Sequence, residues 1–407
     1  MINIMMVIIL QIDTIEIKFK NLLSLMETYP TESEKIIQEW VNNSEIYFPY
    51  LLREFNNPKS SLFAKQKMAI ALGKIKNKEA LPYLYNGLKS TSSGLRASCA
   101  YAIGEIGDTE SIDKLLPLLQ DEHDAVRAEA ISACGKIKDK RAVTPLILYS
   151  LNDPSHVNKA RAIVALSEIG DKSALPYILK FKDDENIIVR TSVAKAIANF
   201  KDTTFINIIE ELHKDKEPIV RKEALIAMSE FPSKRFYKIL RTSLKDSSYI
   251  VRAGIPEIIN SKSLPPETSI IILYELLNDP EKPVKEKAIS AMNNIKKESV
   301  SGFLFIIKEN YPIEQKKWAI DNLIEILGQR DCINKLIAEF PDWDKKKIEK
   351  IVLKQVEKGM TKEEVYLSLG RPSRTRKMQD VEEWEYDNLN KVLKFKNSIL
   401  VEEKKME

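Results

Sequence analysis

The sequence predicts an all-α, right-handed α-solenoid of helical repeats that is followed by a small C-terminal α+β module. Basic residues recur about every 31 residues through most of the 407-residue chain, which indicates a repeat architecture. Only 12 residues are glycine, well below the usual ~7%, and this scarcity disfavours folds built on glycine-rich phosphate-binding turns. The period ends after Gly328, so we expect an N-terminal helical cap at 1–44, the solenoid at 45–327, a helical linker at 328–357 and the module at 358–407.

The first ten residues need a separate interpretation because they are largely apolar. Asn3 interrupts the apolar stretch, and Gln11 and Asp13 follow it. The stretch is too short to span a bilayer as a helix, and it lacks the basic start and small-residue cleavage site of a secretory leader. We expect a helix buried against the next one, with a leader as the alternative.

One basic residue marks the first helix of each repeat, and we call this residue the rung. The rungs are Lys65, Arg96, Arg127, Lys159, Arg190, Arg221, Arg252, Lys285 and Lys316. Six positions after the rung a small residue is usual, and the next position is always apolar. This spacing predicts a buried helix face that a neighbouring helix approaches closely. Each unit is therefore a helical hairpin that must stack on its neighbours to bury both faces.

The turn between the two helices of a repeat carries a short polar side chain twelve residues after the rung. Such a side chain can cap the helix that follows. The predicted caps are Asn77, Asp108, Asp139, Asp171 and Asp202.

A second polar register lies six residues before most rungs, where aspartate recurs. An aspartate in this loop and a basic residue in the first turn of a rung helix can bridge each other or bridge adjacent repeats. We expect this ladder to be structural. It comprises Asp121, Arg127, Asp153, Lys159, Asp184, Arg190, Asp215, Arg221, Asp246 and Arg252.

The unit at 121–137 has the pattern Asp-x5-Arg, followed by alanine, cysteine, glycine and isoleucine at fixed spacings. This unit resembles the HEAT-repeat family. The likeness is greatest to the short, bilin-lyase-type HEAT-like repeats, and it covers about 45–327. It implies an armadillo-like helical scaffold in which the arginine-bearing helices line the concave surface. Ile258, Lys262 and Asn322 depart from the pattern, so we expect the later repeats to pack irregularly.

The C-terminal segment reads as one capped helix and a small sheet. Thr361 and Glu364 have the spacing of a capping box at a helix start. Alternating apolar residues then occur at 384–386, 393–395 and 399–401, which predicts two or three antiparallel strands.

This segment resembles the small outer-membrane-assembly lipoproteins of the SmpA/OmlA-like family, with the pattern Gly-Met-Thr-x-x-Glu-Val, Leu-Gly-x-Pro, Trp-x-Tyr and Phe-x-Asn. The resemblance implies a helix pair against a three-stranded sheet and a non-catalytic binding role. The chain has no lipobox cysteine near its start, so a membrane anchor is not carried over, although membrane association stays open.

The sequence offers little for catalysis, and we expect no catalytic residue, no cofactor and no metal site. HEAT-like hydroxylases bind di-iron through His-Glu dipeptides, whereas His123, His156 and His213 are followed by other residues. The three cysteines are an odd number at wide spacing, which favours neither a disulfide framework nor a zinc site. The alternative is an enzyme or enzyme subunit of the HEAT-like lyase type.

We expect a scaffold that binds a protein or peptide through the concave surface, with a second contact from the C-terminal module. Nucleic-acid binding is less expected because the residues nine positions after the rungs include more acids than bases. The basic cluster near residue 374 is a solvated loop or meets an anionic partner or lipid headgroup. The candidate partner-binding residues are Tyr101, Lys195, Glu257, Trp318, Arg371, Arg374 and Arg376.

The compartment is indicated by two opposing sets of observations. Free cysteines and the missing cleavage site favour the cytoplasm. The apolar start and the C-terminal resemblance favour the cell envelope or periplasm, which is the alternative.

Overall fold

The computed structural model describes residues 2–260, 264–295 and 299–406, with side chains from residue 14 onward. Lys262 and the side chains of the apolar start therefore lie outside the described residues. The chain divides into two compact units, Met1–Phe231 and Pro232–Glu407.

The first unit opens with α1 (Ile2–Thr28), α2 (Ser33–Asn42) and α3 (Ser44–Phe55). Phe19 of α1 is buried, and its ring centroid lies 5.5 Å from that of Trp40 and 6.3 Å from that of Tyr47. The later part of α1 is thus packed on the next two helices. Within the described residues, no helix combines the length and the apolar character needed to cross a membrane.

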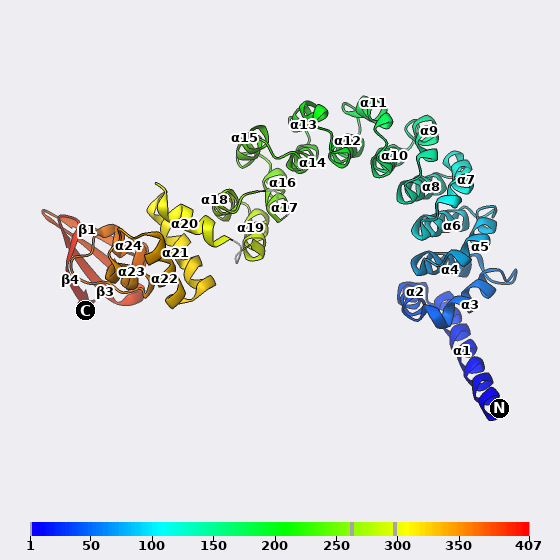
Figure 1. Ribbon diagram of the computed structural model, residues 1–407, viewed down its shortest axis with the longest axis horizontal. Helices are drawn as coiled ribbons and strands as arrows, with labels where there is room; N and C mark the ends of the chain where they lie inside the picture. The colour runs from blue at the N-terminus through cyan, green and yellow to red at the C-terminus, as the bar shows by residue number, and fades with distance from the viewer. Residues whose placement is uncertain (1, 261–263, 296–298, 407) are drawn as a thin grey trace. The chain divides into compact units, whose positions relative to one another are not determined.

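Repeats follow, each with a long rung helix and a shorter second helix. The rung helices are α4 (Leu62–Ile75), α6 (Ser93–Ile106), α8 (Asp124–Ile137), α10 (His156–Ile169), α12 (Ile187–Phe200) and α14 (Pro218–Ser229). The second helices are α5 (Leu81–Gly87), α7 (Ile112–Leu115), α9 (Val143–Pro145), α11 (Leu175–Ile178) and α13 (Ile206–Leu212). Within this unit the rung helices lie along the inner side of a curve and the second helices along its outer side (Figure 1). The predicted solenoid of hairpins is confirmed.

Short 3₁₀ segments complete many of the turns. They are η1 (Pro30–Glu32), η2 (Lys78–Ala80), η3 (Thr109–Ser111), η4 (Leu116–Gln120), η5 (Lys140–Ala142), η7 (Lys172–Ala174), η8 (Leu179–Phe181), η9 (Thr203–Phe205) and, in the second unit, η11 (Asp387–Leu389), while η6 (Leu146–Ser150) is a π-helical turn.

Polar caps fix the two ends of each turn. Asn77, Asp139, Asp171 and Asp202 each accept a hydrogen bond from the backbone N–H two residues later, as predicted. Asp108 makes no such cap; it accepts a 2.7 Å hydrogen bond from Lys78 Nζ of the preceding repeat. The two kinds of bond are compatible, because Asp202 caps its turn and also accepts a 2.9 Å hydrogen bond from Lys172 Nζ.

Successive rung helices approach closely at small residues. A Cβ added to Gly104 of α6 would lie 2.7 Å from the Cα of Ala133 on α8. In the same way, a Cβ added to Gly73 would meet Ala102, and one added to Gly135 would meet Ala165. A larger side chain at these positions would force the helices apart, because in each case the added Cβ would lie 2.6–2.9 Å from a backbone Cα of the next rung helix.

The second unit continues with a less regular set of helices. They are α15 (Lys234–Ser243), α16 (Tyr249–Arg252), α17 (Ile255–Asn260), α18 (Pro266–Leu277), α19 (Lys282–Ile295), α20 (Val300–Lys308), α21 (Ile313–Leu327) and α22 (Gln329–Glu339). The helix that carries Arg252 is broken into α16 and α17. Pro256 explains the break, because proline cannot donate the backbone hydrogen bond that would continue the helix.

The unit ends in the linker helix α23 (Lys345–Val352) and the module, which contains α24 (Lys362–Leu369) and four antiparallel strands in the order β1-β2-β3-β4. The strands are β1 (Arg374–Met378), β2 (Val381–Tyr386), β3 (Lys391–Lys396) and β4 (Ile399–Lys405). The capping box of Thr361 and Glu364 is present. The prediction of two or three strands was short by one, because every side chain of β1 is exposed and the strand shows no apolar alternation.

The sheet packs one face against the preceding helices. Trp384 and Phe395 lie with ring centroids 4.7 Å apart on this face. Tyr386 donates a 2.9 Å hydrogen bond to the carbonyl of Gly370, where α24 ends. Leu393 is fully buried beside them.

Two Gly→Ala substitutions on α6 test the close packing of the rung helices. We expect Gly104→Ala to lower the free energy of unfolding by roughly 1–3 kcal/mol, because the new methyl group overlaps the backbone of α8. Gly94→Ala is the matched control, since its Cβ would meet only the flexible end of Gln66. Urea unfolding monitored by circular dichroism measures both. Equal effects at the two positions would contradict the interpretation.

Candidate functional site

The rung arginines connect neighbouring repeats through both side chain and backbone. Arg127 Nε donates to Asp153 Oδ2 at 2.7 Å, and its Nη2 donates to Oδ1 of the same carboxylate at 3.2 Å. Its Nη1 donates to the backbone carbonyl of Asp121, in its own loop, at 2.8 Å. One guanidinium therefore ties its own loop to the loop of the following repeat.

The same arrangement recurs along the chain. The Nε···Oδ2 distances are 2.8 Å for Arg96–Asp121, 2.6 Å for Arg190–Asp215 and 2.6 Å for Arg252–Asp279. The sequence allows each arginine to pair with the aspartate of its own loop or with that of an adjacent repeat. In the structure these arginines pair with the aspartate of the following repeat. Each aspartate also accepts a hydrogen bond from a backbone N–H two residues later in its own loop, for example from Ser155 to Asp153 at 2.8 Å.

The ladder is interrupted at Lys159, which forms no ion pair with any residue that the structure describes. Its neighbour Asn158 donates to Asp153 Oδ2 and to the carbonyl of Asp124, both at 3.2 Å, and so adds to the preceding link of the ladder. Asp184 accepts only a backbone bond among the interactions described for its carboxylate, from Asn186 at 2.8 Å. A lysine ammonium lacks the forked geometry that lets arginine serve two acceptors at once.

Two more ladder residues, Arg221 and Asp246, make the same side-chain to backbone hydrogen bonds. Arg221 Nη1 donates to the carbonyls of Asp215 and Lys216 at 2.8 and 3.0 Å. Asp246 accepts a hydrogen bond from the N–H of Ser248 at 2.9 Å.

Burial makes the ladder energetically sensitive. The side chain of Asp153 is only 2% exposed. Burial alone raises the pKa of this carboxyl, but hydrogen bonds from Arg127, the N–H of Ser155 and Asn158 outweigh burial and hold the pKa below its ordinary value. The pKa of Asp121 is lowered in the same way, against burial, by Arg96 and the N–H of His123. The ionised form is therefore the one that the folded loops stabilise.

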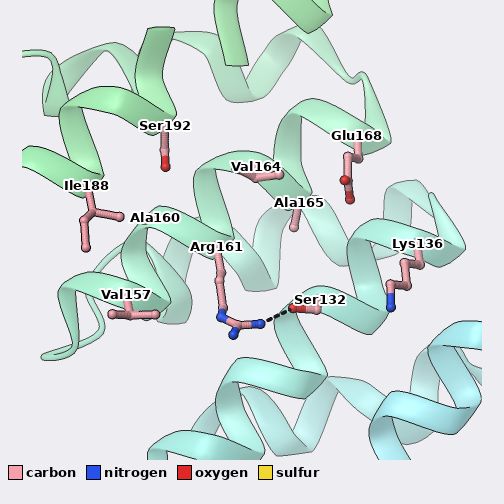
Figure 2. Close-up of a pocket in the computed structure, with 10 residues that line it drawn as sticks. All are labelled: Ser132, Lys136, Val157, Ala160, Arg161, Val164, Ala165, Glu168, Ile188 and Ser192. Atoms are coloured by element: carbon pink, nitrogen blue, oxygen red, sulfur yellow. Dashed lines mark hydrogen bonds between the residues drawn. The ribbon is translucent and has the colours of Figure 1, made fainter. Parts of the chain in front are cut away.

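The inner face, which is the exposed surface of α4, α6, α8, α10, α12 and α14, contains a hollow of about 330 Å³ between α8 and α12. Its apolar lining comes from Val157, Val164 and Ile188, with alanines between them. Figure 2 shows Arg161 pointing across the hollow, where its guanidinium donates a 3.0 Å hydrogen bond to Ser132 Oγ. Lys136 and Glu168 lie at the end of the hollow opposite Val157 and Ile188 (Figure 2).

An exposed aliphatic row runs across three rung helices beside this hollow. Val157, Ile188 and Ile219 each stand two residues before a rung, and they are 47%, 51% and 38% exposed. Sequence analysis missed this row, although the 31-residue spacing of three aliphatic residues in one register was a sufficient signal. Equivalent positions on equivalent helices form one continuous row because each repeat stacks on the last.

A second, smaller hollow of about 270 Å³ on the same face includes the predicted residue Tyr101. Lys136 Nζ lies 4.9 Å from the centre of the Tyr101 ring and 2.5 Å from Glu105 Oε1. Tyr101 is thus held by its neighbours while one side of its ring borders the hollow.

The other predicted binding residues are separate from these hollows. Lys195 Nζ lies 3.7 Å from a carboxylate oxygen of Glu223 on the inner face. Glu257 accepts a 2.7 Å bond from Lys287 in the second unit. Trp318 is half-buried, with its ring against Tyr274 and Phe303 at centroid distances of 4.9 and 5.3 Å.

The predicted basic cluster divides between a loop and a strand. Arg371 is exposed before β1, whereas Arg374 and Arg376 belong to β1. The interpretation of this whole cluster as a solvated loop was therefore wrong. A guanidinium nitrogen of Arg376 lies 3.5 Å from Glu385 on β2.

Among the residues that the structure describes, no three histidine, cysteine, aspartate or glutamate side chains come together to hold a metal ion. Burial, with a smaller contribution from Asp139, raises the pKa of Cys134 to about 12, which keeps this thiol protonated. His156 starts α10, and its Nε2 lies 3.8 Å from Glu185.

Comparison with known proteins agrees with both parts of this fold. A model of HEAT repeats matches overlapping stretches from residue 64 to residue 293, and a model of the outer membrane protein assembly factor BamE domain matches residues 346–399. No similar sequence is found among curated proteins.

Several solved structures are similar to this chain at low sequence identity. The complex of CpcE and CpcF of phycocyanin lyase from Nostoc sp. PCC7120 is 18% identical, with 60% of this chain and 93% of that chain covered and a TM-score of 0.39. YibA from E. coli is 23% identical, with 61% and 92% covered and a TM-score of 0.42. Computationally designed armadillo repeat proteins for modular peptide recognition are 21% identical, with 45% and 99% covered and a TM-score of 0.34.

The interrupted rung provides a matched test of the ladder. We expect Arg127→Ala to lower the free energy of unfolding by roughly 2–4 kcal/mol, because it leaves the buried carboxylate of Asp153 without its counter-ion. Lys159→Ala, in the same register but without an ion pair among the described residues, should cost about 1 kcal/mol or less. Urea unfolding of both variants measures the difference. A ladder without a structural role would give two equally small changes.

The same carboxylate predicts a pH dependence. The folded-state pKa of Asp153 is below its unfolded value of about 3.9, so its contribution is complete above about pH 4 and is lost as the pH falls through the folded-state pKa. We expect Asp153→Asn to destabilise the protein by roughly 1–3 kcal/mol at pH 7. The gap from wild type should shrink below about pH 4. Urea titrations at pH 7, 5 and 3 measure this gap, and a gap that is constant with pH would contradict the prediction.

Proposed function

Because the chain belongs to the HEAT-repeat family and carries a BamE-type domain near its C-terminal end, we propose that it is a non-catalytic scaffold for a protein or peptide partner. The inner face of the repeats makes the first contact, and the C-terminal module makes a second. The observation that carries the proposal is the exposed row of Val157, Ile188 and Ile219 beside the hollow of α10.

The spacing of this row suits an extended chain. Packed helices lie 8–10 Å apart, so the row spans roughly 16–20 Å. An extended segment of about six residues covers that length at ~3.3 Å per residue. A partner segment of this length can therefore reach all three repeats.

The charges of the inner face support a peptide over a nucleic acid. Arg161 and Lys136 are basic, but Glu129 and Glu168 are interspersed with them. A face with alternating signs produces no continuous positive field for phosphates. Arg161 still has donors available, since one hydrogen bond to Ser132 and a 3.8 Å contact with Glu129 are its described polar interactions.

The magnitudes explain why a second contact is useful. The three aliphatic side chains are already about half-buried, so covering the remainder of each contributes only about 1 kcal/mol. Binding must also offset the lost freedom of the partner. The inner face alone is therefore a weak site, and a second site on the same chain raises the overall affinity when one assembly can reach both.

Photocrosslinking at matched positions tests this proposal. A photoreactive phenylalanine analogue replaces Tyr101 or Val157 on the inner face, and the control replaces Tyr177, which is 44% exposed on α11 at the outer side. We expect discrete protein adducts in cells from the inner-face positions, and we expect Val157→Ser/Ile188→Ser/Ile219→Ser to reduce the Tyr101 adducts severalfold. Equal adducts from both sides, or a pigment or small molecule retained in place of a protein, would overturn the proposal.

The compartment belongs to the same proposal. The sequence favours the cytoplasm, whereas the BamE-type domain supports the cell envelope. Cell fractionation with N-terminal sequencing of the mature protein decides between the two.

A further inference from the structure

The two edge strands of the C-terminal sheet differ in whether their outer backbone groups are hydrogen-bonded. The beginning of β4 is covered on its outer side, because Gly359 N–H donates to the carbonyl of Leu400 at 2.9 Å and Leu400 N–H donates to that of Met360 at 2.8 Å. The outer side of β1 has no backbone partner among the described residues, and all five of its side chains are exposed. The sheet can therefore accept a further strand at β1.

Charge alternates from strand to strand across this sheet. β1 carries Arg374, Arg376 and Lys377, β2 is rich in glutamate, and β3 is rich in lysine. Ion pairs between neighbouring strands connect these charges. They are Arg376–Glu385 at 3.5 Å, Lys394–Glu383 at 2.9 Å and Lys391–Glu403 at 2.6 Å. The strand that continues this alternation outside β1 is acidic.

The basic residues of β1 exceed the carboxylates available to them. Arg374 and Arg376 lie 3.8 and 3.5 Å from one carboxylate, that of Glu385, and their side chains are 64% and 61% exposed. Lys377 stands opposite Glu382, whose carboxylate already accepts a 2.6 Å bond from Lys362. Positive charge is therefore left for a partner along the open edge.

We propose that β1 binds an extended acidic segment of a partner protein, which adds a fifth strand to the sheet. Backbone hydrogen bonds along the open edge hold the segment, and its carboxylates pair with Arg374, Arg376 and Lys377. This site would be the second contact of the proposed scaffold, made through backbone hydrogen bonds and ion pairs. Its role in the scaffold rests on the proposed function.

The placement of the charges favours a strand over an anionic lipid surface. Because successive strand residues point to opposite faces, Arg374 and Arg376 project to one face of the sheet and Lys377 projects to the other. An added strand presents side chains to both faces, whereas a flat membrane meets one. A charged edge can also serve only to prevent pairing with other strands, and the experiment includes this outcome.

Peptide binding to the full chain, followed by fluorescence anisotropy, tests the site. The probe is labelled Thr-Glu-Val-Glu-Glu-Val-Glu-Thr, whose carboxylates fall on both faces of a strand. Its control is Thr-Glu-Pro-Glu-Glu-Pro-Glu-Thr, which has the same charge but lacks a backbone donor on each of its two edges. We expect the first peptide to bind at least tenfold more tightly. Arg374→Glu/Arg376→Glu should weaken it at least tenfold, and Lys404→Glu/Lys405→Glu, an equal change of charge on β4, less than twofold.

Hydrogen exchange of the wild-type chain gives a second readout that does not depend on any variant. We expect the strand-forming peptide to slow amide exchange over residues 373–378. Lys377→Glu, on the other face from Glu385, replaces the double variant if that variant unfolds, and it should also weaken binding.

Three results would overturn the site. Equal binding of both peptides would show attraction by charge alone, and no binding would show an edge that only prevents pairing. Binding to vesicles of phosphatidylcholine with phosphatidylglycerol that depends on Arg374 and Arg376, without peptide protection, would show a lipid site. Adducts at Val157 in cells report the inner-face contact itself and are expected even if the peptide does not bind β1, so failure here is distinguishable from failure of the scaffold proposal.

Discussion

The double engagement of the rung arginines Arg96, Arg127, Arg190 and Arg252 is the interaction on which the arrangement of the repeats depends. The guanidinium holds a carbonyl of its own loop and the aspartate of the next loop, and that aspartate holds an N–H of the loop to which it belongs, as Arg127, Asp121 and Asp153 show. Loops are therefore joined in series along one edge of the stack. Because solenoid repeats contact only their neighbours, such links set the geometry from one repeat to the next.

The exposed aliphatic row is placed by this ladder. Val157 lies four residues after the ladder residue Asp153 and two before the rung, in the first turn of α10. The position of that turn follows from the loop before it, which the arginine and aspartate bonds fix. A change in the ladder is therefore expected to alter the spacing of the binding row as well as stability, even though the ladder residues do not form the row.

The sequence predicts the repeats well because one period controls burial, caps and charge together. Rungs, alanines and turn caps are local features, and each is fixed by its spacing along the helix. The partner of Arg127 is different: spacing allows Asp121 and Asp153 equally, and only the stacking of repeats selects Asp153. The strand β1 was missed for a related reason, since its charged residues are ordered by pairing with β2 and not by an apolar pattern of their own.

The two proposed contacts differ in chemistry, and this difference constrains the partner. The inner face offers aliphatic side chains with balanced charges, whereas β1 offers unpaired backbone groups with surplus positive charge. Each is small, and a segment that satisfies one does not satisfy the other. Tight binding therefore requires a partner, or an assembly, that carries an aliphatic extended segment and an acidic strand within reach of one chain. For such a partner the second contact forms at an effective concentration on the order of millimolar, so two weak sites together give selective binding that neither gives alone.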